Sequence, residues 1–392
     1  MSLTDSSQHI LDLKDARQMN LWVDDPIAED PQYLYNQLIT YIGNKRALLG
    51  LIGQAVHRVK QRLGKDRLRV FDTFAGSGVV SRYLKAHAER LVSNDFEKYA
   101  AVIGRCYLRN RSSVDLHALG EIVKDFNAQV DRIELPPGFI EELYAPRDED
   151  RITAGDRVFY TLDNARLLDN YRRMIESAPE GLQDMLLGPL LSQASIHANT
   201  SGVFKGFYKD RRTGIGRFGG SNGDALTRIR GPINLEVPVL SRFECEVEVL
   251  QQDANQAARE VKNLDLAYVD PPYNQHPYGS NYFMLNLLVD YKRPGHLSRV
   301  SGIPTNWRRS GYNVRSRSLP LLRDLLQTLD SPFLLVSFNN EGFIKPETLQ
   351  AVLADIGRVE FVERQYNAFR GSRNLRNRET YVTEQLFLVE RR

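Results

Sequence analysis

The first half of the chain contains a regular succession of apolar and polar stretches. Residues 68–71 (LRVF) form a short apolar run that ends in a glycine-rich turn at 72–78. Apolar residues then recur at helical spacing over 79–88, and a second short run follows at 90–95. Strand, glycine-rich turn, helix and strand in this order are typical of a nucleotide-binding βαβ unit.

Three further apolar runs, at 264–269, 333–338 and 384–389, predict more strands of the same sheet. The run at 264–269 must end at Asp270, because the two prolines that follow cannot continue a central strand. We therefore predict an α/β fold with a mostly parallel sheet.

The stretch 111–244 does not follow this alternation. Its first part has helical patterns, over 117–130, 163–177 and 184–198, and residues 202–223 are glycine-rich and basic. We predict three parts of the chain: an N-terminal tail at 1–30, a catalytic domain formed by 31–110 and 245–392, and an inserted, largely helical subdomain at 111–244.

The distribution of charge is more informative than its sum. The 392 residues carry a net charge of only +3. Lys and Arg nevertheless gather in three stretches: 203–231 has seven against two acids, 292–323 has eight and no acid, and 364–378 has five and no acid. Such stretches can neutralise nucleic-acid phosphates, although each of them alone could equally be a solvated surface.

Several classes of protein are not supported by the sequence. The two cysteines, Cys106 and Cys245, show no CxxC spacing, which argues against a disulfide framework and a cysteine zinc site. The polar N-terminus has no signal-peptide core, and no run approaches the roughly 20 apolar residues of a membrane helix. We expect a protein of the reducing cytosol, without a metal ion or a membrane anchor.

The tetrapeptide Asp270-Pro271-Pro272-Tyr273 follows a predicted strand, where ligands bind in open α/β sheets. The exocyclic amine of a base is a poor nucleophile, because its lone pair is delocalised into the ring. The Asp270 side chain and the Pro271 carbonyl, held rigid by Pro272, could accept hydrogen bonds from both N–H groups. Tyr273 offers a flat face for a base taken out of the duplex. The purely structural alternative is a Pro-Pro turn.

The glycine turn Phe74-Ala75-Gly76-Ser77-Gly78 lets the backbone approach a ligand closely. It lacks the third glycine of a dinucleotide-binding motif, which argues against a bound pyrophosphate. Asp72, just before the turn, would suit the cationic amino group of a methionine moiety.

Two more carboxylates follow predicted strands. Asp95 could bind the hydroxyl groups of a ribose, with a helix N-cap as the alternative, and Phe96 could flank an adenine ring. Asp253 could accept a hydrogen bond from an adenine amino group.

Taken in order, Tyr41-Ile42-Gly43-Asn44-Lys45, the turn at 74–78, Asp95, Asp253 and the motif at 270–273 resemble the alpha-class, Dam-like family of adenine-N6 DNA methyltransferases. The resemblance is to methylases of type II restriction–modification systems. It implies a Rossmann-like methyltransferase fold with a seven-stranded sheet, in which 111–244 recognises the target. It also implies S-adenosylmethionine as cofactor, duplex DNA as substrate, and a monomeric bacterial enzyme with a separately encoded endonuclease.

Carried over position by position, the resemblance implies two groups of site residues. The cofactor pocket would be lined by Tyr41, Lys45, Asp72, Phe74, Ala75, Gly76, Gly78, Asp95, Phe96 and Asp253. The target adenine would be held by Asp270, Pro271, Pro272 and Tyr273. From the basic stretches and the segment after 273, we expect DNA contacts from Lys205, Arg211, Arg212, Asn281, Tyr282, Arg308, Arg309, Arg370, Arg373 and Arg376.

Three alternatives remain open on the sequence alone. The same chemistry would serve the amino group of cytosine, although that group of enzymes more often has Ser in place of Asp270. An RNA substrate is a second alternative. The third is a catalytically silent DNA-binding protein, against which the intact motifs at 74–78 and 270–273 argue.

Overall fold

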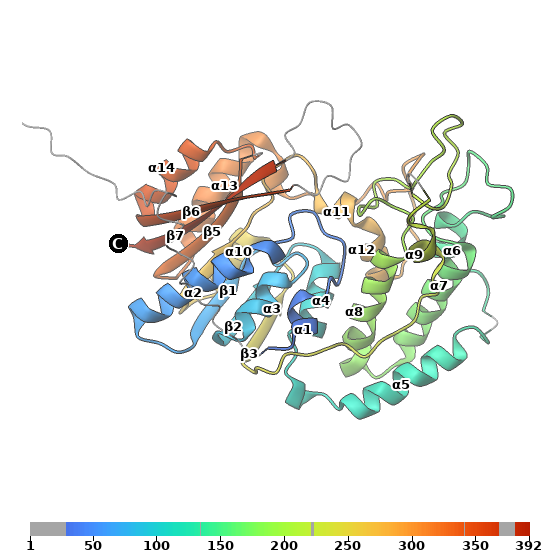
Figure 1. Ribbon diagram of the computed structural model, residues 1–392, viewed down its shortest axis with the longest axis horizontal. Coiled ribbons are helices and arrows are strands. Elements are labelled where there is room, and N and C mark those ends of the chain that lie inside the picture. The colour runs from blue at the N-terminus through green and yellow to red at the C-terminus, as the bar shows by residue number, and fades with distance from the viewer. Residues whose placement is uncertain (1–28, 134, 221–222, 341, 368–380) are drawn as a thin grey trace, which may run out of the picture.

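The computed structural model describes residues 29–133, 135–220, 223–340, 342–367 and 381–392 (Figure 1). The residues predicted as an N-terminal tail therefore lie almost entirely outside the described part of the chain. The same is true of Arg370, Arg373 and Arg376, whose expected contacts with DNA stay a prediction.

A seven-stranded sheet with the order β3-β2-β1-β4-β5-β7-β6 forms the centre of the fold (Figure 1). Neighbouring strands from β3 to β5 are parallel, and β7 is antiparallel to both β5 and β6. The predicted α/β class and the methyltransferase fold with a mostly parallel sheet are thus confirmed. The strands are β1 Leu68–Asp72, β2 Ala88–Asn94, β3 Glu246–Leu250, β4 Leu266–Val269, β5 Phe333–Asn339, β6 Gly357–Asn367 and β7 Tyr381–Arg391.

Helices cover both faces of the sheet, so strands β4 and β5 are buried along their whole length. Alternate strand residues point to opposite faces: Val70 and Leu266 pack in one apolar cluster, and Phe71 and Ala267 in the other. Helices α2, α3 and α4 contribute to the first cluster, and α10, α13 and α14 to the second. These helices span α2 Leu49–Leu63, α3 Val79–Lys85, α4 Lys98–Tyr107, α10 Ala254–Glu260, α13 Arg315–Thr328 and α14 Pro346–Ile356.

Residues 111–244 contribute helices and none of the described strands of the sheet. The helices lie side by side beyond one end of the sheet (Figure 1) and span α5 Leu116–Gln129, α6 Phe139–Tyr144, α7 Leu162–Ser177, α8 Glu180–Ile196 and α9 Leu226–Arg230. Helix α8 packs closely on α4, since a β-carbon at Gly188 would lie 2.7 Å from Sγ of Cys106. This segment shares an apolar cluster with the sheet, and its separate role in target recognition stays a prediction.

The remaining helices are short. One lies in the N-terminal part of the chain, and two follow the segment after β4. They are α1 Pro31–Tyr35, α11 Tyr278–Asn281 and α12 Phe283–Asp290, with 3-10 turns at Arg46–Leu48, Arg111–Ser113 and Gly311–Asn313. Within the described residues, no helix combines the length and the apolar character needed to cross a membrane.

Candidate active site

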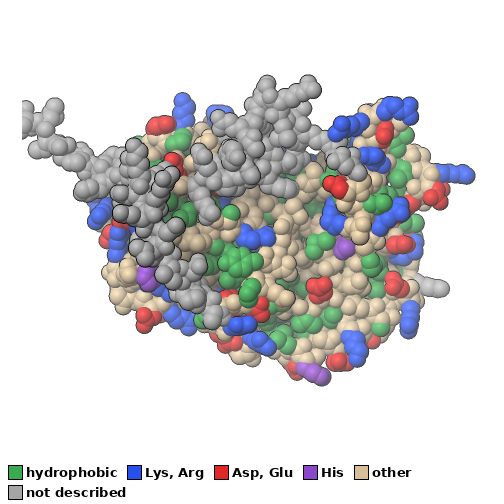
Figure 2. All heavy atoms as spheres, in the orientation of Figure 1, with side chains coloured by type: hydrophobic (Ala, Val, Ile, Leu, Met, Phe, Trp, Pro, Cys, Tyr) green, Lys and Arg blue, Asp and Glu red, His purple; other side chains and the backbone are tan. Residues whose placement is uncertain are grey.

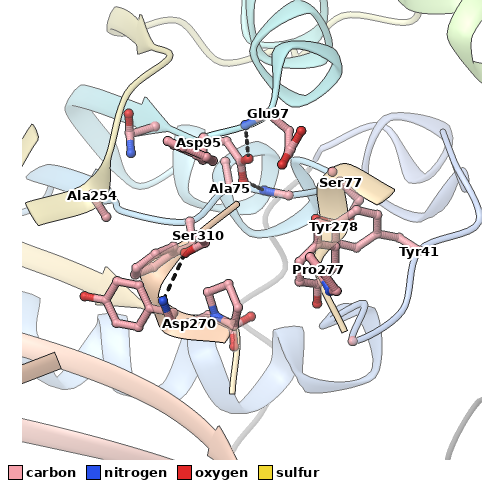
Figure 3. A pocket seen from close by; sticks show the side chains of 18 of the residues that line it. Tyr41, Ala75, Ser77, Asp95, Glu97, Ala254, Asp270, Pro277, Tyr278 and Ser310 are labelled. Atoms are coloured by element: carbon pink, nitrogen blue, oxygen red, sulfur yellow. Dashed lines mark hydrogen bonds between the residues drawn. The ribbon is translucent and has the colours of Figure 1, made fainter. Parts of the chain in front are cut away.

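A pocket lies at the edge where the parallel strands end, with about 840 Å³ of empty space when the solvent at its open mouth is included. The strand register sets this place, because Asp72 of β1 pairs with Ser93 of β2 and with Tyr268 of β4, so that the three strands end side by side. Figure 3 shows side chains from distant parts of the sequence around it. Of the residues predicted for the site, the pocket is lined by Tyr41, Lys45, Phe74, Ala75, Gly76, Asp95, Phe96, Asp253, Asp270 and Pro272.

The glycine turn is held open by Asp95. Gly76 has a positive φ of +55°, and its N–H donates to Oδ2 of Asp95 at 2.8 Å. The N–H of Glu97 donates to Oδ1 of the same carboxylate, also at 2.8 Å (Figure 3). Burial raises the pKa of Asp95, while these backbone N–H groups oppose the rise. Asp95 thus both shapes the turn and faces the pocket.

One wall of the pocket is aromatic. The rings of Tyr41, Tyr278 and Tyr282 form a stacked cluster, with the centroid of Tyr41 5.0 Å from that of Tyr278 and 4.9 Å from that of Tyr282. The hydroxyl of Tyr282 accepts a hydrogen bond from the N–H of Ile42 at 2.8 Å, which fixes the loop that carries Tyr41. This cluster closes the pocket beside the glycine turn.

The opposite end of the pocket combines an aromatic ring, a guanidinium group and a helix cap. The Arg308 guanidinium lies 4.5 Å from the centroid of Phe96, and its Nη1 donates to the Phe96 carbonyl at 2.8 Å. Oδ1 of Asp253 caps α10 by accepting from the N–H groups of Asn255 and Gln256. Flat and polar groups are therefore placed side by side, as a purine ring requires.

Asp270 presents a carboxylate to the pocket directly after β4. Nζ of Lys45 lies 3.1 Å from its Oδ1, which is buried and forms an ion pair with this ammonium group. Burial raises the pKa of Asp270 to about 6, although the ammonium group of Lys45 lowers it. The side chain of Asp270 is 15% exposed, so the carboxylate can also accept a hydrogen bond from a ligand in the pocket.

The rest of the tetrapeptide supports this position. Pro272 lines the pocket, whereas Pro271 is buried. The ring of Tyr273 tilts against Phe338 with centroids 5.7 Å apart, and its carbonyl accepts from the N–H of Phe343 at 2.8 Å. The role of Tyr273 as a platform for a base stays a prediction.

Over residues 41–328, the chain matches the family described as D12 class N6 adenine-specific DNA methyltransferase. The chain belongs to this family. The methyltransferase is 27% identical over 366 residues to the type II methyltransferase M.NlaIII of Neisseria lactamica, which covers 90% of this chain and 99% of the relative. It is also 27% identical to the type II methyltransferase M.CviAII of Paramecium bursaria Chlorella virus 1 (90% of this chain, 98% of the relative). A third relative, modification methylase StsI of Streptococcus sanguinis, is 26% identical over 90% of this chain and 52% of its own length.

The structure corrects the placement of Asp72 and Gly78. Asp72 is fully buried beneath the turn, where its Oδ2 accepts from Oγ of Ser81 at 2.6 Å, so its carboxylate does not line the pocket of the methyltransferase. Gly78 begins helix α3 in the left-handed conformation, with φ +75°, and also lies outside the pocket wall.

Asn281 and Tyr282, expected to contact DNA, are buried. These residues are 2% and 0% exposed, because helices α11 and α12 are packed into the apolar core rather than presented to solvent. Arg308 was expected at the DNA as well, and its exposed side chain lies over Phe96 at the pocket. The neighbouring Arg309 is also exposed and stacks on Trp307, with 4.4 Å from its guanidinium to the ring.

Lys205, Arg211 and Arg212 are exposed, as a role in DNA contact requires. Arg211 and Arg212 lie at the tip of a short hairpin that is closed by the bridge between Lys209 and Gly216. Figure 2 shows Lys and Arg side chains gathered at the side of the molecule where the loops after α8 lie.

Several residues that line the pocket were not predicted from the sequence. Glu97 and Tyr278 could have been suspected, because each follows closely on a motif residue. The segment after Trp307 had no such signal: it lies within a basic stretch, yet it contributes Ser310, Tyr312 and Asn313 to the pocket. Asn313 is fixed there by a hydrogen bond from its Nδ2 to the carbonyl of Asn274, at 2.8 Å.

Proposed function

We propose that this methyltransferase uses S-adenosylmethionine to methylate N6 of adenine at a specific site in duplex DNA. The observation that carries the proposal is the carboxylate of Asp270, which is held by Lys45 through its Oδ1 and is 15% exposed at the pocket. It lies in the wall of the pocket that Gly76 and Asp95 also line. Direct methyl transfer requires that the methyl donor and the target amine be held in the same cavity.

The pocket residues fit the parts of S-adenosylmethionine. Asp95 is placed for ribose hydroxyl groups, the stacked pair of Phe96 and Arg308 for the adenine, and Asp253 for its amino group. Gly76 lets Tyr41 pack against the glycine turn at the pocket, because a β-carbon there would lie 2.8 Å from Cε1 of Tyr41. When bound, the cofactor supplies a methyl group made electrophilic by its sulfonium.

The chemical work of the chain is then to hold and activate the amine. The Asp270 carboxylate accepts one N–H of the target adenine, and the carbonyl of Pro271 accepts the other, which localises the nitrogen lone pair. The amine gains positive charge as it attacks, and the Asp270 carboxylate stabilises that charge. The methylated amine afterwards loses one proton. Taking the base out of the duplex is needed for this geometry.

A radiolabelled methyl-transfer assay with duplex DNA, followed by mass analysis of the digested nucleosides, tests the proposal. The expected product is N6-methyladenine, and methylated cytosine would contradict it. Asp270→Ala should abolish transfer while calorimetry still detects binding of S-adenosylmethionine. Asp355→Ala, which removes an exposed carboxylate of α14, is the matched control and should keep wild-type activity.

We further propose that the enzyme acts in a restriction–modification system, as a monomer beside a separately encoded endonuclease. The names of the relatives support this, because M.NlaIII and M.CviAII are called type II methyltransferases. Sequencing with modified-base detection of DNA from bacterial cells that express the protein should show one recurrent methylated sequence. Methylation scattered without a common sequence would contradict the proposal.

A further inference from the structure

A cluster of three charged groups lies in the wall of the pocket and directly behind it. Nζ of Lys45 is 3.1 Å from Oδ1 of Asp270 and 2.6 Å from Oε1 of Glu384. The side chain of Lys45 is 3% exposed and that of Glu384 is fully buried, whereas that of Asp270 is 15% exposed and faces the pocket. The ammonium group therefore bridges one carboxylate in the active site and one outside it.

The position of Glu384 follows from the antiparallel strand of the sheet. In β7, Glu384 pairs with Asn339 at the carboxyl end of β5. Because β7 runs in the opposite direction, its early residues reach the edge where the parallel strands end. Oγ of Ser337 donates a hydrogen bond to Oε1 of Glu384 at 3.4 Å, which helps to hold the carboxylate beside Lys45.

The three groups do not share the ammonium group equally. Nζ of Lys45 is closest to Glu384 and also donates to the carbonyl of Gly43 at 3.3 Å. It also forms an ion pair with Asp270, whose Oδ1 is buried against it at 3.1 Å. Glu384 outside the pocket and Asp270 inside it thus hold the same ammonium group, with Glu384 as the closer partner.

We propose that Glu384 is a positioning residue for methyl transfer, which holds Lys45 so that the Asp270 carboxylate keeps its orientation toward the amino group of the target base. This rests on the proposed role of Asp270. Without Glu384, the ammonium group of Lys45 would pair with Asp270 alone, which would make Asp270 a poorer acceptor for the amine.

Glu384 also sets the charge of the cluster. Two carboxylates and one ammonium group carry a net charge of −1, whereas Lys45 and Asp270 alone would be neutral. The amine becomes positive as it attacks, so a net negative cluster stabilises the transition state and a neutral pair does so less. Both effects of Glu384 act on the rate of transfer rather than on cofactor binding.

A pH profile separates this role from simple structural support. The charged groups near Asp270 are Lys45, which lowers its pKa, Glu384, which raises it, and the buried carboxyl of Asp72, whose own pKa is raised by Asp270. Replacement of Glu384 by Gln therefore moves the pKa of Asp270 downward, and the acid limb of kcat/KM should shift to lower pH. Replacement of Lys45 by Met should shift that limb to higher pH.

The experiment compares the wild-type enzyme with Glu384→Gln, Glu384→Asp, Lys45→Met and the double variant Lys45→Met/Glu384→Gln. Glu390→Gln, which removes a partly exposed carboxylate of the same strand, is the matched control. For each protein, thermal melting, cofactor affinity, DNA affinity and the single-turnover rate of adenine methylation are measured.

Glu384→Gln should lower the single-turnover rate about tenfold or more, with both affinities within about twofold of wild type. Glu384→Asp should recover part of the rate. If Glu384 acts through Lys45, the double variant should be no slower than Lys45→Met alone. Because the double variant leaves no unpaired buried ammonium group, it tests the proposal even if Glu384→Gln does not fold.

An unchanged rate in Glu384→Gln, or rate reductions of Glu384→Gln and Lys45→Met that simply add in the double variant, would overturn the role of Glu384 while the wild-type enzyme still methylates adenine. A wild-type enzyme and a Glu390→Gln control that transfer no methyl group to adenine would instead overturn the proposed function, and the role of Glu384 with it.

Discussion

The ring of Tyr41 lies directly against Gly76 of the glycine turn. A β-carbon at Gly76 would be 2.8 Å from Cε1 of Tyr41, closer than real contacts allow. Tyr41 cannot yield easily, since its ring is stacked against both Tyr278 and Tyr282. The loop at 41–45 and the turn at 74–78 thus form one rigid wall, although about thirty residues separate them.

We expect Gly76→Ala to lower the affinity for S-adenosylmethionine about tenfold or more, because the added methyl group displaces Tyr41 and strains a backbone with positive φ. Calorimetric titration of the cofactor measures the effect. Gly50→Ala is the control: it adds the same methyl group in helix α2, where nothing lies within 4 Å, and should leave the affinity unchanged. Equal affinities for the two variants would contradict a rigid wall formed by Tyr41 and the glycine turn.

The pH dependence of the reaction should report Asp270. Burial raises its pKa to about 6, so the carboxylate is charged above that pH and becomes protonated as the pH falls through it. A protonated Asp270 is a poorer acceptor and cannot stabilise positive charge. We expect kcat/KM for DNA to fall about tenfold per pH unit below this value. A profile that stays flat down to pH values about two units lower would contradict it.

The sequence predicted the centre of the fold and of the site well, because both depend on local patterns. The run 264–269 and the prolines after it end β4 before Asp270, as predicted. The predicted helix at 79–88 is shorter, however, and Ala88 already belongs to β2. Strand β6 was missed altogether: it is defined by its pairing with β7 rather than by its own apolar run.

The side chains that lie elsewhere than predicted are those whose role depended on the direction in which they point. Asp72 belongs to β1, whose last side chain turns beneath the glycine turn toward Ser81. Tyr282 looked suited to hold a base, but its neighbours in α12 are apolar and bury it. Glu384 is predicted only as part of a strand, and the antiparallel pairing is what places it beside Lys45. Such contacts between distant segments leave no periodic trace in a sequence.

Arg308 should matter for the cofactor rather than for DNA. Its guanidinium group stacks on Phe96 at the pocket, so Arg308→Ala should weaken binding of S-adenosylmethionine about tenfold. Arg309→Ala removes the same charge from the next residue, which stacks on Trp307 instead, and should leave cofactor affinity unchanged. Calorimetry of both variants decides between the two roles. If Arg308→Ala lowers DNA affinity alone, the assignment to the cofactor pocket fails.

The hairpin tip at Arg211 and Arg212 offers the most direct test of DNA contact by the segment 111–244. Both side chains are exposed, and the N–H of Arg212 donates to Oδ1 of Asp210, which fixes the turn that presents them. For duplex DNA, removing one cationic side chain from a phosphate lowers the slope of log affinity against log salt concentration by about 0.9. We therefore expect the double variant Arg211→Ala/Arg212→Ala to lower that slope by about 1 to 2, with cofactor affinity unchanged. Lys124→Ala on α5 is the control: this side chain is 78% exposed, and its helix lies at the opposite edge of the molecule from the hairpin (Figure 1). If both variants change the salt slope equally, the effect reflects overall charge and the hairpin does not bind the phosphates specifically.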